Sequence, residues 1–373
     1  MTAPRTPFDA VLVVSFGGPL GLDDVRPFLA NVLRGRRVAP ARLDAVAGHY
    51  AHFAGVSPIT ALTYRQAAGL QARLRDYGPD LPVYVGMRNW QPFLADTLEE
   101  MARDGVRRAV GFVTAAHRSY SSCGQYKQNV ADARASLAAR GLPDVDVRFV
   151  GDWYAAEGFV LANATHVAAA LGQLPTDLRS RATVVFTAHS IPVSMAEASR
   201  YEANLQASAR AVMAHLRPMP WAVVYQSRSG RPEDPWLEPD VCDYLRAGYA
   251  RGELQAVVLC PLGFVSDHVE VLYDLDHEAG ALCAALGLPM ARARAANDAG
   301  PFLDLMADEV RRVYAHGASR VSLPVVSGRP PVQVEGAPPA RPAGVTLAGR
   351  VDRVDLAAIP TWSPPREPCG GPG

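Results

Sequence analysis

Residues 256–278 read AVVLCPLGFVSDHVEVLYDLDHE, and this stretch guides the interpretation of the whole chain. It begins with an uncharged apolar run from Ala256 to Phe264, as is typical of a strand buried inside a parallel sheet. Polar and acidic residues follow that run directly. Because open α/β sheets bind ligands beyond the carboxyl ends of their strands, the stretch predicts a parallel sheet and a functional site at its edge.

Three carboxylates recur at every fourth position after the apolar run: Glu270, Asp274 and Glu278. A step of four residues drifts by only about 40° around an ideal α-helix, so these side chains form a narrow acidic stripe, which a local π-bulge would align further. Oxygen ligands in a row suit a divalent metal or a proton relay. An isolated pattern of this kind is more often a solvated helix face, but the buried strand before it favours a site.

Strand and helix patterns alternate along the rest of the chain. Apolar runs predict strands at residues 10–16, 81–87, 108–114, 182–187, 221–226 and 255–259, and amphipathic spacing predicts helices at 93–104, 195–216 and 301–318. This alternation is typical of parallel sheets covered by helices on both faces. The two halves share one rhythm, so we expect an α/β fold of two similar Rossmann-like, doubly wound domains with a cleft between them.

The domain boundaries follow from the same rhythm. We expect the first domain to span residues 1–160, joined by the helix 301–318, and the second to span residues 161–300. Beyond residue 327 the chain is rich in Pro, Gly and Ala. Because this composition buries little apolar surface, we expect residues 327–373 to form a loose tail.

Composition narrows the functional class. Lys plus Arg and Asp plus Glu number 37 each among 373 residues, so the chain lacks the basic excess that nucleic acid or an anionic membrane attracts. It has no apolar run of membrane-spanning length and no signal-peptide core, and we expect a cytoplasmic protein. The balanced charge suits a monomer. Five scattered cysteines without a Cys-x-x-Cys pair argue against a disulfide framework or a zinc site.

His189 directly follows the strand pattern 182–187 and therefore sits at a strand end. A histidine there can take up and release protons near neutral pH, or it can be a structural residue bonded to a backbone carbonyl. Position alone does not separate these two readings. The chain has no P-loop, dinucleotide-binding or nucleophile-elbow motif, so nucleotide-driven and triad chemistry have no support.

Cationic, hydroxyl and aromatic groups gather in two other places. A loop after the strand 108–114 is rich in hydroxyls and holds Arg118, which can bind a carboxylate or phosphate, although Ser clusters more often satisfy their own turn. Arg34 and Arg36, together with the His49–Phe53 group, form a basic and aromatic surface. Such a surface suits a flat, anionic, apolar ligand, although in isolation it is more often a solvated helix end.

Taken in order, these segments resemble the ferrochelatase family, whose members insert Fe²⁺ into a porphyrin during haem synthesis. The resemblance covers residues 11–313. It rests on the ordered motifs SFGGP (15–19), GVSPIT (55–60), TAHSIP (187–192), YQSRSG (225–230), DPWL (234–237) and GFVSDHVE (263–270). The forms GMRNW (86–90) and HRSYSSC (117–123) look most like the actinobacterial-type branch. By this resemblance, that branch metallates coproporphyrin III, and a separate enzyme later decarboxylates the product to haem.

The resemblance implies a role for each main residue. His189 matches the active-site histidine that takes pyrrole protons or meets the metal, and Glu270 matches the carboxylate facing it across the porphyrin. Asp274 and Glu278 match the rest of a stripe that passes metal or protons. Two inner N–H protons must leave the porphyrin as Fe²⁺ enters, so one face needs a base and the metal path needs carboxylates.

The resemblance also implies porphyrin contacts. Ser57, Tyr126 and the Arg34/Arg36 region match places near the propionates. Coproporphyrin carries four propionates where protoporphyrin carries two, so we expect further partners from His49, Tyr50 and Arg118.

Several positions depart from the family pattern. Phe16 replaces a tyrosine that ligates the metal in some relatives, which favours His189 as the axial contact. Asn89 replaces a histidine proposed to handle incoming metal, and His49 replaces an arginine used on a propionate. Some relatives hold a [2Fe–2S] cluster on four cysteines, but the C-terminal region here offers only Cys369, so we expect no cluster and no other cofactor.

Other functions remain open from the sequence. The porphyrin can be protoporphyrin IX instead of coproporphyrin III. Cobalt and nickel chelatases often use paired histidines where this chain has His189 and Glu270, which argues against them. A carrier that binds porphyrin or haem without turnover would need neither a base nor an acid. We expect porphyrin and Fe²⁺ as partners, together with other haem-pathway enzymes.

Overall fold

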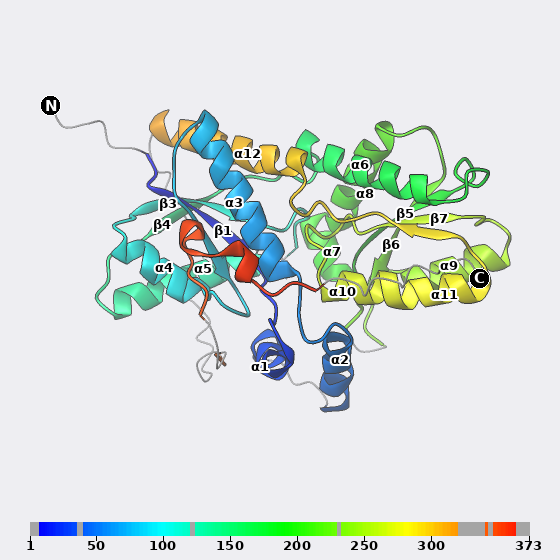
Figure 1. Cartoon of the computed structure of the whole chain (residues 1–373), viewed down its shortest axis with the longest axis horizontal. Helices are drawn as coiled ribbons and strands as arrows, with labels where there is room; N and C mark the ends of the chain where they lie inside the picture. Colours follow the sequence, from blue (N-terminus) through cyan, green and yellow to red (C-terminus); the bar gives the residue numbers. More distant parts are fainter. Residues whose placement is uncertain are drawn as a thin grey trace, which may run out of the picture.

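The computed structural model describes residues 7–35, 40–119, 124–229, 233–319, 340–341 and 346–362. Two four-stranded sheets, parallel throughout, lie side by side with helices around them (Figure 1). The first contains β1 (Ala10–Ser15), β2 (Val83–Met87), β3 (Arg108–Val113) and β4 (Asp146–Phe149) in the order β2-β1-β3-β4. The second contains β5 (Thr183–His189), β6 (Trp221–Gln226), β7 (Val257–Cys260) and β8 (Met290–Arg292) in the order β6-β5-β7-β8. The two halves thus repeat one topology, which confirms the predicted fold class.

Helices connect and cover the strands. Those of the first half are α1 (Leu22–Val32), α2 (Pro40–His52), α3 (Ile59–Tyr77), α4 (Leu94–Arg103) and α5 (Gln125–Ala139). Those of the second half are α6 (Glu157–Gln173), α7 (Val193–Ser199), α8 (Tyr201–Ala214), α9 (Val241–Ala250), α10 (Val269–Val271), the π-helix η2 (Leu272–Ala279) and α11 (Gly280–Leu286). After β8 come α12 (Gly300–Ser319) and two short 3₁₀ turns, η3 (Val351–Arg353) and η4 (Leu356–Ala358).

Both faces of each sheet are buried, because alternate strand residues enter different cores. In β1, Val11 and Val13 share a core with α3 and α12, whereas Leu12 and Val14 share one with α4 and α5. The core under α3 and α12 continues into the second half, where it includes Phe186 of β5 and residues of α6 and α8. The helix α12 packs against α3, β3 and α6, and we retain residues 1–160 with this helix, and 161–300, as the proposed domain division.

The structure corrects two predictions. The predicted helix 195–216 is two helices, α7 and α8, because Arg200 adopts a left-handed conformation (φ 56°) that ends α7. Part of the predicted loose tail is ordered: residues 346–362 pack on the first sheet and bury Val351 and Ile359. Their backbone bonds to an edge strand, and Arg353 pairs with Glu100 of α4 and with Asp104 directly after it, which composition alone does not reveal.

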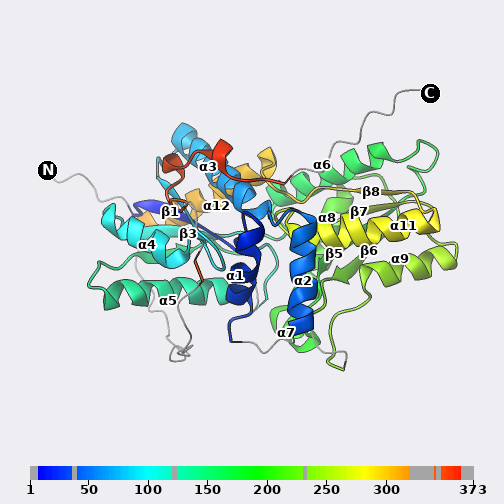
Figure 2. The same ribbon diagram turned by 60° about the horizontal axis from the view of Figure 1, so that its bottom comes forward.

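Two helices stand apart from the sheets. Figure 2 shows α1 and α2 next to each other between the two halves of the molecule. They share an apolar cluster with Trp90, Phe93 and the start of the acidic helix, including Val269 and Leu272. Within the described ranges, no helix combines the length and the apolar character needed to cross a membrane.

Candidate active site

The acidic helix and His189 lie at the point where the order of the second sheet reverses. His189 is the last residue of β5, and the chain leaving the neighbouring strand β7 leads directly into α10 and η2 (Figure 1). In doubly wound sheets the connections from such a pair of strands run to opposite faces and open a crevice at the carboxyl edge. The histidine and the carboxylate stripe therefore follow the two neighbouring strands, β5 and β7, between which the strand order reverses. We call this place the switch point.

His189 is half-buried, and its ring orientation is fixed by the backbone. Its Nδ1 contacts the carbonyl oxygen of Ser190, which can only accept, so Nδ1 carries the proton in the neutral ring. The lone pair is then on Nε2. The loop around the ring is also held, because Ser190 Oγ donates to the carbonyl of Leu237 (2.8 Å) and Tyr201 Oη donates to the carbonyl of His189 (3.3 Å). This arrangement presents Nε2 as a base or a metal ligand.

The predicted carboxylate stripe lies on α10 and η2, and η2 is a π-helix over residues 272–279. Its wider turn brings residues four apart closer to one line than an α-helix does. Leu272, Leu275 and Ala279 are buried on the opposite side of the helix. Glu270 and Glu278 are exposed, and Asp274 between them is half-buried. The stripe is therefore the open side of a helix whose other side is core.

Asp274 is held at the carboxyl end of β6. It accepts hydrogen bonds from Gln226 Nε2 (3.1 Å) and from the hydroxyl of Ser227. Gln226 is the direct partner of His189 in the β5–β6 register, so one residue lies between the histidine and the carboxylate. Burial raises the pKa of Asp274 to about 7, and the neighbouring charge of Glu270 adds to this effect. Asp274 can thus gain and lose a proton near neutral pH.

The charge of Glu270 acts on side chains of α2 and α5. Burial raises the pKa of Tyr50 on α2 and of Tyr126 on α5, and the charge of Glu270 raises both further. Burial lowers the pKa of His49 and of His268, and here Glu270 acts in the opposite direction. The charge of Glu270 therefore acts on the pKa values of two tyrosines and two histidines around it.

His268 connects the two sides of the site. It precedes α10, is influenced by the charges of both Glu270 and His189, and lies edge-on to Phe264 at a ring distance of 5.1 Å. Sequence reasoning gave no role to His268, nor to Gln226 and Ser227. Gln226 ends the strand pattern 221–226 at the same sheet edge as His189, and that position was the available signal.

A buried ion pair fixes the start of the acidic helix. Asp267, two residues before α10, accepts from Arg292 Nη1 (2.7 Å) and from Asn297 Nδ2 (2.7 Å). Arg292 also reaches Asp276 on η2 through Nε (2.5 Å). Removing one partner of such a pair leaves an uncompensated buried charge, so these bonds hold the helix against the end of β8.

The predicted porphyrin contacts divide into two groups. Phe16, Tyr50 and the ring of His49 lie near the acidic helix: Phe16 and Tyr50 join the apolar cluster with Val269, and His49 stacks on Tyr273 (3.7 Å between ring centroids). Ser57 is buried after α2, and its neighbour Gly18 has no room for a Cβ, which explains that motif glycine.

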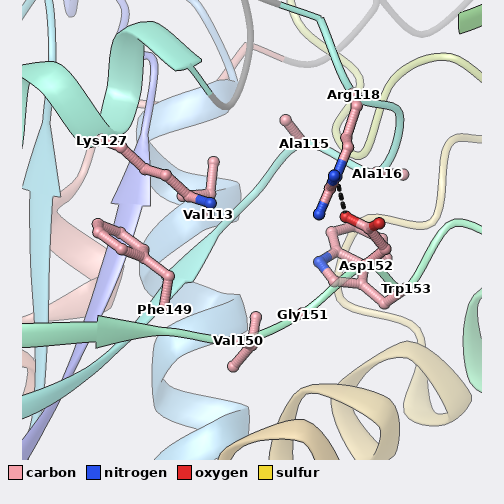
Figure 3. A pocket seen from close by; sticks show the side chains of 10 residues that line it. All are labelled: Val113, Ala115, Ala116, Arg118, Lys127, Phe149, Val150, Gly151, Asp152 and Trp153. Carbon is pink, nitrogen blue, oxygen red and sulfur yellow. Dashed lines mark hydrogen bonds and ion pairs between the residues drawn. The ribbon is translucent and has the colours of Figure 1, made fainter. Parts of the chain in front are cut away.

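The predicted cations lie farther out. Arg34 is exposed on the turn after α1 and donates to Asn31 Oδ1 (2.7 Å). Arg36 falls outside the described residues. Arg118 forms an ion pair with Asp152, and both line a cavity at the ends of β3 and β4 with Lys127 (Figure 3). That cavity has a volume of about 30 Å³, the size of a water molecule, so it is not a macrocycle site.

The structure also bears on where metal ligands could gather. Across the part of the chain that is described, no three or more His, Cys, Asp or Glu side chains gather closely enough to hold a metal ion. Asn89 is buried and bonds through Nδ2 to the carbonyl of Phe16 (3.3 Å). Its contact is therefore structural, joining the loops after β1 and β2.

Comparisons with known proteins show the family to which the chain is similar. The ferrochelatase family model matches residues 8–314. The coproporphyrin III ferrochelatase of Streptomyces griseus subsp. griseus is 47% identical over 307 residues, 78% of this chain and 82% of that protein. That of Mycolicibacterium smegmatis is 41% identical over 345 residues, 92% and 97% of the two chains. A Rhodopirellula baltica ferrochelatase is 46% identical over 303 residues, 80% and 84% of the two.

Among solved structures, SirB from Bacillus subtilis with Fe³⁺ has a TM-score of 0.51 at 12% identity. The match covers 84% of this chain and 98% of that one. At this identity the likeness concerns the fold alone.

Proposed function

Because this chain belongs to the ferrochelatase family, we propose that it inserts Fe²⁺ into coproporphyrin III and forms coproheme for haem biosynthesis. The family makes it a metal chelatase with a porphyrin and iron as substrates. The choice of coproporphyrin is supported by the relatives that carry that name. We further propose a monomer that acts in the cytoplasm beside other haem-pathway enzymes and needs no bound cofactor.

The observation that supports the mechanism is the position of His189 and Asp274 at one sheet edge: Gln226, which donates to Asp274, is paired with His189 in the register of β5 and β6. Metallation releases two protons from the porphyrin nitrogens as Fe²⁺ enters. The Nε2 lone pair of His189 accepts the two pyrrole protons one after the other and releases each to solvent, and Asp274 beside it, with a pKa of about 7, assists this release. The product core is then neutral, because the two positive charges of the iron replace two protons.

Glu270 is assigned to the opposite side of the macrocycle. Its exposed carboxylate faces elements that carry Tyr50, Tyr126 and His49, where it offsets the positive charge of the arriving iron. Glu278 extends the metal path toward solvent. Because the porphyrin supplies four nitrogens, the protein does not need a preformed cage, which fits the absence of one among the described residues.

The propionates are assigned to the hydroxyl and cationic groups around this site. Tyr50, Ser57 and Tyr126 are buried hydroxyl donors, and Arg34 is the exposed cation nearest to the α1–α2 turn. Arg36, His49 and Arg118 complete the proposed set, with Phe16 against the macrocycle. Arg118 contributes only if it exchanges Asp152 for a propionate.

Anaerobic iron insertion followed by absorbance tests the proposal. The unmodified chain receives Fe²⁺ with coproporphyrin III or protoporphyrin IX in separate reactions, and Zn²⁺ replaces Fe²⁺ as a redox-inert control. We expect insertion into both with a strong preference for coproporphyrin. A preference for protoporphyrin would overturn the substrate assignment. Spectra that shift on porphyrin binding but never on metal addition would favour a carrier and contradict the enzyme.

A further inference from the structure

The C-terminal part of the chain returns to the first sheet. Residues 340–341 and 346–362, which we call the strap, include the red segment beside α3 that runs toward α10 (Figure 1). β2 is an edge strand, and its Val85 N–H donates to the carbonyl of Gly349 (2.8 Å). Tyr64 Oη on α3 donates to the carbonyl of Ala348. The strap thereby closes the open edge of the first sheet.

Carboxylates of α4 hold the strap by its arginines. Arg341 forms two bonds with Asp96 (2.9 Å each), and Arg353 bonds Glu100 (2.7 Å) and Asp104 (2.9 Å). These pairs are partly exposed, so each contributes little, but together they fix the register of the strap.

The start of the strap is clamped by Asn31 of α1. Asn31 Nδ2 donates to the carbonyl of Ala340 (3.1 Å), and Asn31 Oδ1 accepts from the N–H of Ala340 (3.0 Å). The same amide donates to the carbonyl of Asn89 (3.1 Å) and accepts from Arg34 Nη2 (2.7 Å). One side chain thus joins the strap, the loop after β2 and a cation of the proposed porphyrin site.

The end of the strap contacts the turn directly after α2. Trp362 lies edge-to-face on Phe53 at 4.8 Å between ring centroids, and it packs against the apolar cluster that holds Tyr50, Val269 and Leu272. An edge-to-face aromatic pair is a directional contact. The two ends of the strap therefore contact α1 and the turn after α2, next to the proposed porphyrin residues Arg34, His49 and Tyr50.

We propose that Asn31 and Trp362 are positioning residues: through them the strap holds α1 and α2 in the orientation that binds the porphyrin. This inference rests on the proposed function, because Arg34, His49 and Tyr50 are assigned to the porphyrin there. The inference predicts an effect on porphyrin binding and none on proton transfer. Loss of either contact loosens the α1–α2 pair and weakens porphyrin binding, while the proton transfer at His189 and Asp274 on the second sheet is unaffected.

Arg353→Ala is the matched control. It removes one of the partly exposed arginine contacts of the strap, while Arg341, the Val85–Gly349 bond and Tyr64 still hold the strap and its contacts to Asn31 and Phe53 remain. If the strap only stabilised the fold, all three alanine variants would lower thermal stability and would not differ from one another in KM or kcat. These variants are Asn31→Ala, Trp362→Ala and Arg353→Ala. Trp362→Phe keeps an aromatic ring on Phe53 and should restore the behaviour of the unmodified chain.

The experiment measures KM for coproporphyrin III and kcat on the four variants, and amide hydrogen exchange without porphyrin. For Asn31→Ala and Trp362→Ala we expect KM to rise about tenfold, the scale of one lost hydrogen bond or one lost aromatic pair, with kcat within about twofold. We expect exchange in residues 22–35 and 40–53 to accelerate. Arg353→Ala and Trp362→Phe should change neither quantity.

Unchanged KM and unchanged exchange in both test variants would overturn the inference, as would an Arg353→Ala variant with the same kinetic defect. If a test variant does not fold, Trp362→Leu, which keeps apolar volume without the ring, replaces it with the same expectation. An inactive unmodified chain would contradict the proposed function instead, and hydrogen exchange would still report whether the strap restrains α1 and α2.

Discussion

At the scale of single residues, Asp274 shows how the site adjusts a carboxylate. Burial and the adjacent Glu270 disfavour its charged form, while Ser227 and Gln226 stabilise that form by donating to it. The balance leaves a pKa of about 7, far above the ordinary value of 3.8. The sequence predicted the position of Asp274 in a stripe. It did not predict this pKa, which depends on partners from β6 that are distant in the chain.

The raised pKa predicts how Asp274→Asn changes the free energy of unfolding. Between pH 4 and 7 the folded chain binds a proton at Asp274 that the unfolded chain has lost, so the unmodified chain loses stability as pH rises. The neutral amide does not titrate. The difference in free energy of unfolding between the variant and the unmodified chain should therefore shift in favour of the variant by up to about 4 kcal/mol from pH 4 to pH 8.

Urea unfolding measured at several pH values, with a chelator present, checks this prediction. The control is Asp243→Asn, because Asp243 pairs with Arg246 on the surface of α9. A difference between Asp274→Asn and the unmodified chain that does not change with pH would contradict it.

At the scale of elements, local sequence patterns predicted the buried strands and the acidic helix. The apolar runs gave six strands close to their observed bounds, and the four-residue spacing predicted the acidic helix, part of which is the π-helix η2. The edge strands β4 and β8 were missed because they are short and only partly buried. The break at Arg200 and the strap depend on tertiary contacts, which have no local signature.

The close packing of β5 against the chain after β7 predicts the effect of Gly263→Ala. A Cβ at Gly263 would overlap the Cβ of Ala188, the residue before His189, so β5 must shift at its catalytic end. We expect a loss of stability of about 1–3 kcal/mol, as for an overpacked core, together with a lower kcat.

Gly280→Ala is the matched control, because a Cβ there meets nothing closer than 3.7 Å. It should be neutral or add up to about 1 kcal/mol, since alanine favours a helix. Thermal unfolding and iron insertion measure both variants. A Gly263→Ala variant as stable and active as Gly280→Ala would show that the two chain segments do not constrain His189.

At the scale of the whole molecule, two sheets of identical order carry different parts of one site. The second half supplies the proposed site residues His189, Asp274 and Glu270, and the first half supplies Tyr50 on α2 and Tyr126 on α5, whose pKa values respond to the charge of Glu270. The repeated rhythm of the sequence predicted both sheets. It could not show how the halves face each other, because that depends on the shared core of α3, α6 and α12.

The central claim is that His189 performs the proton transfer in iron insertion. The most direct test compares anaerobic insertion of Fe²⁺ into coproporphyrin III by the unmodified chain, by His189→Ala and by the control His316→Ala, whose ring bonds its own helix at the carbonyl of Arg312 (2.7 Å). We predict that His189→Ala loses at least about a hundredfold in turnover, the contribution of a general base, while it still binds porphyrin. His316→Ala should match the unmodified chain. Undiminished turnover by His189→Ala would contradict the account.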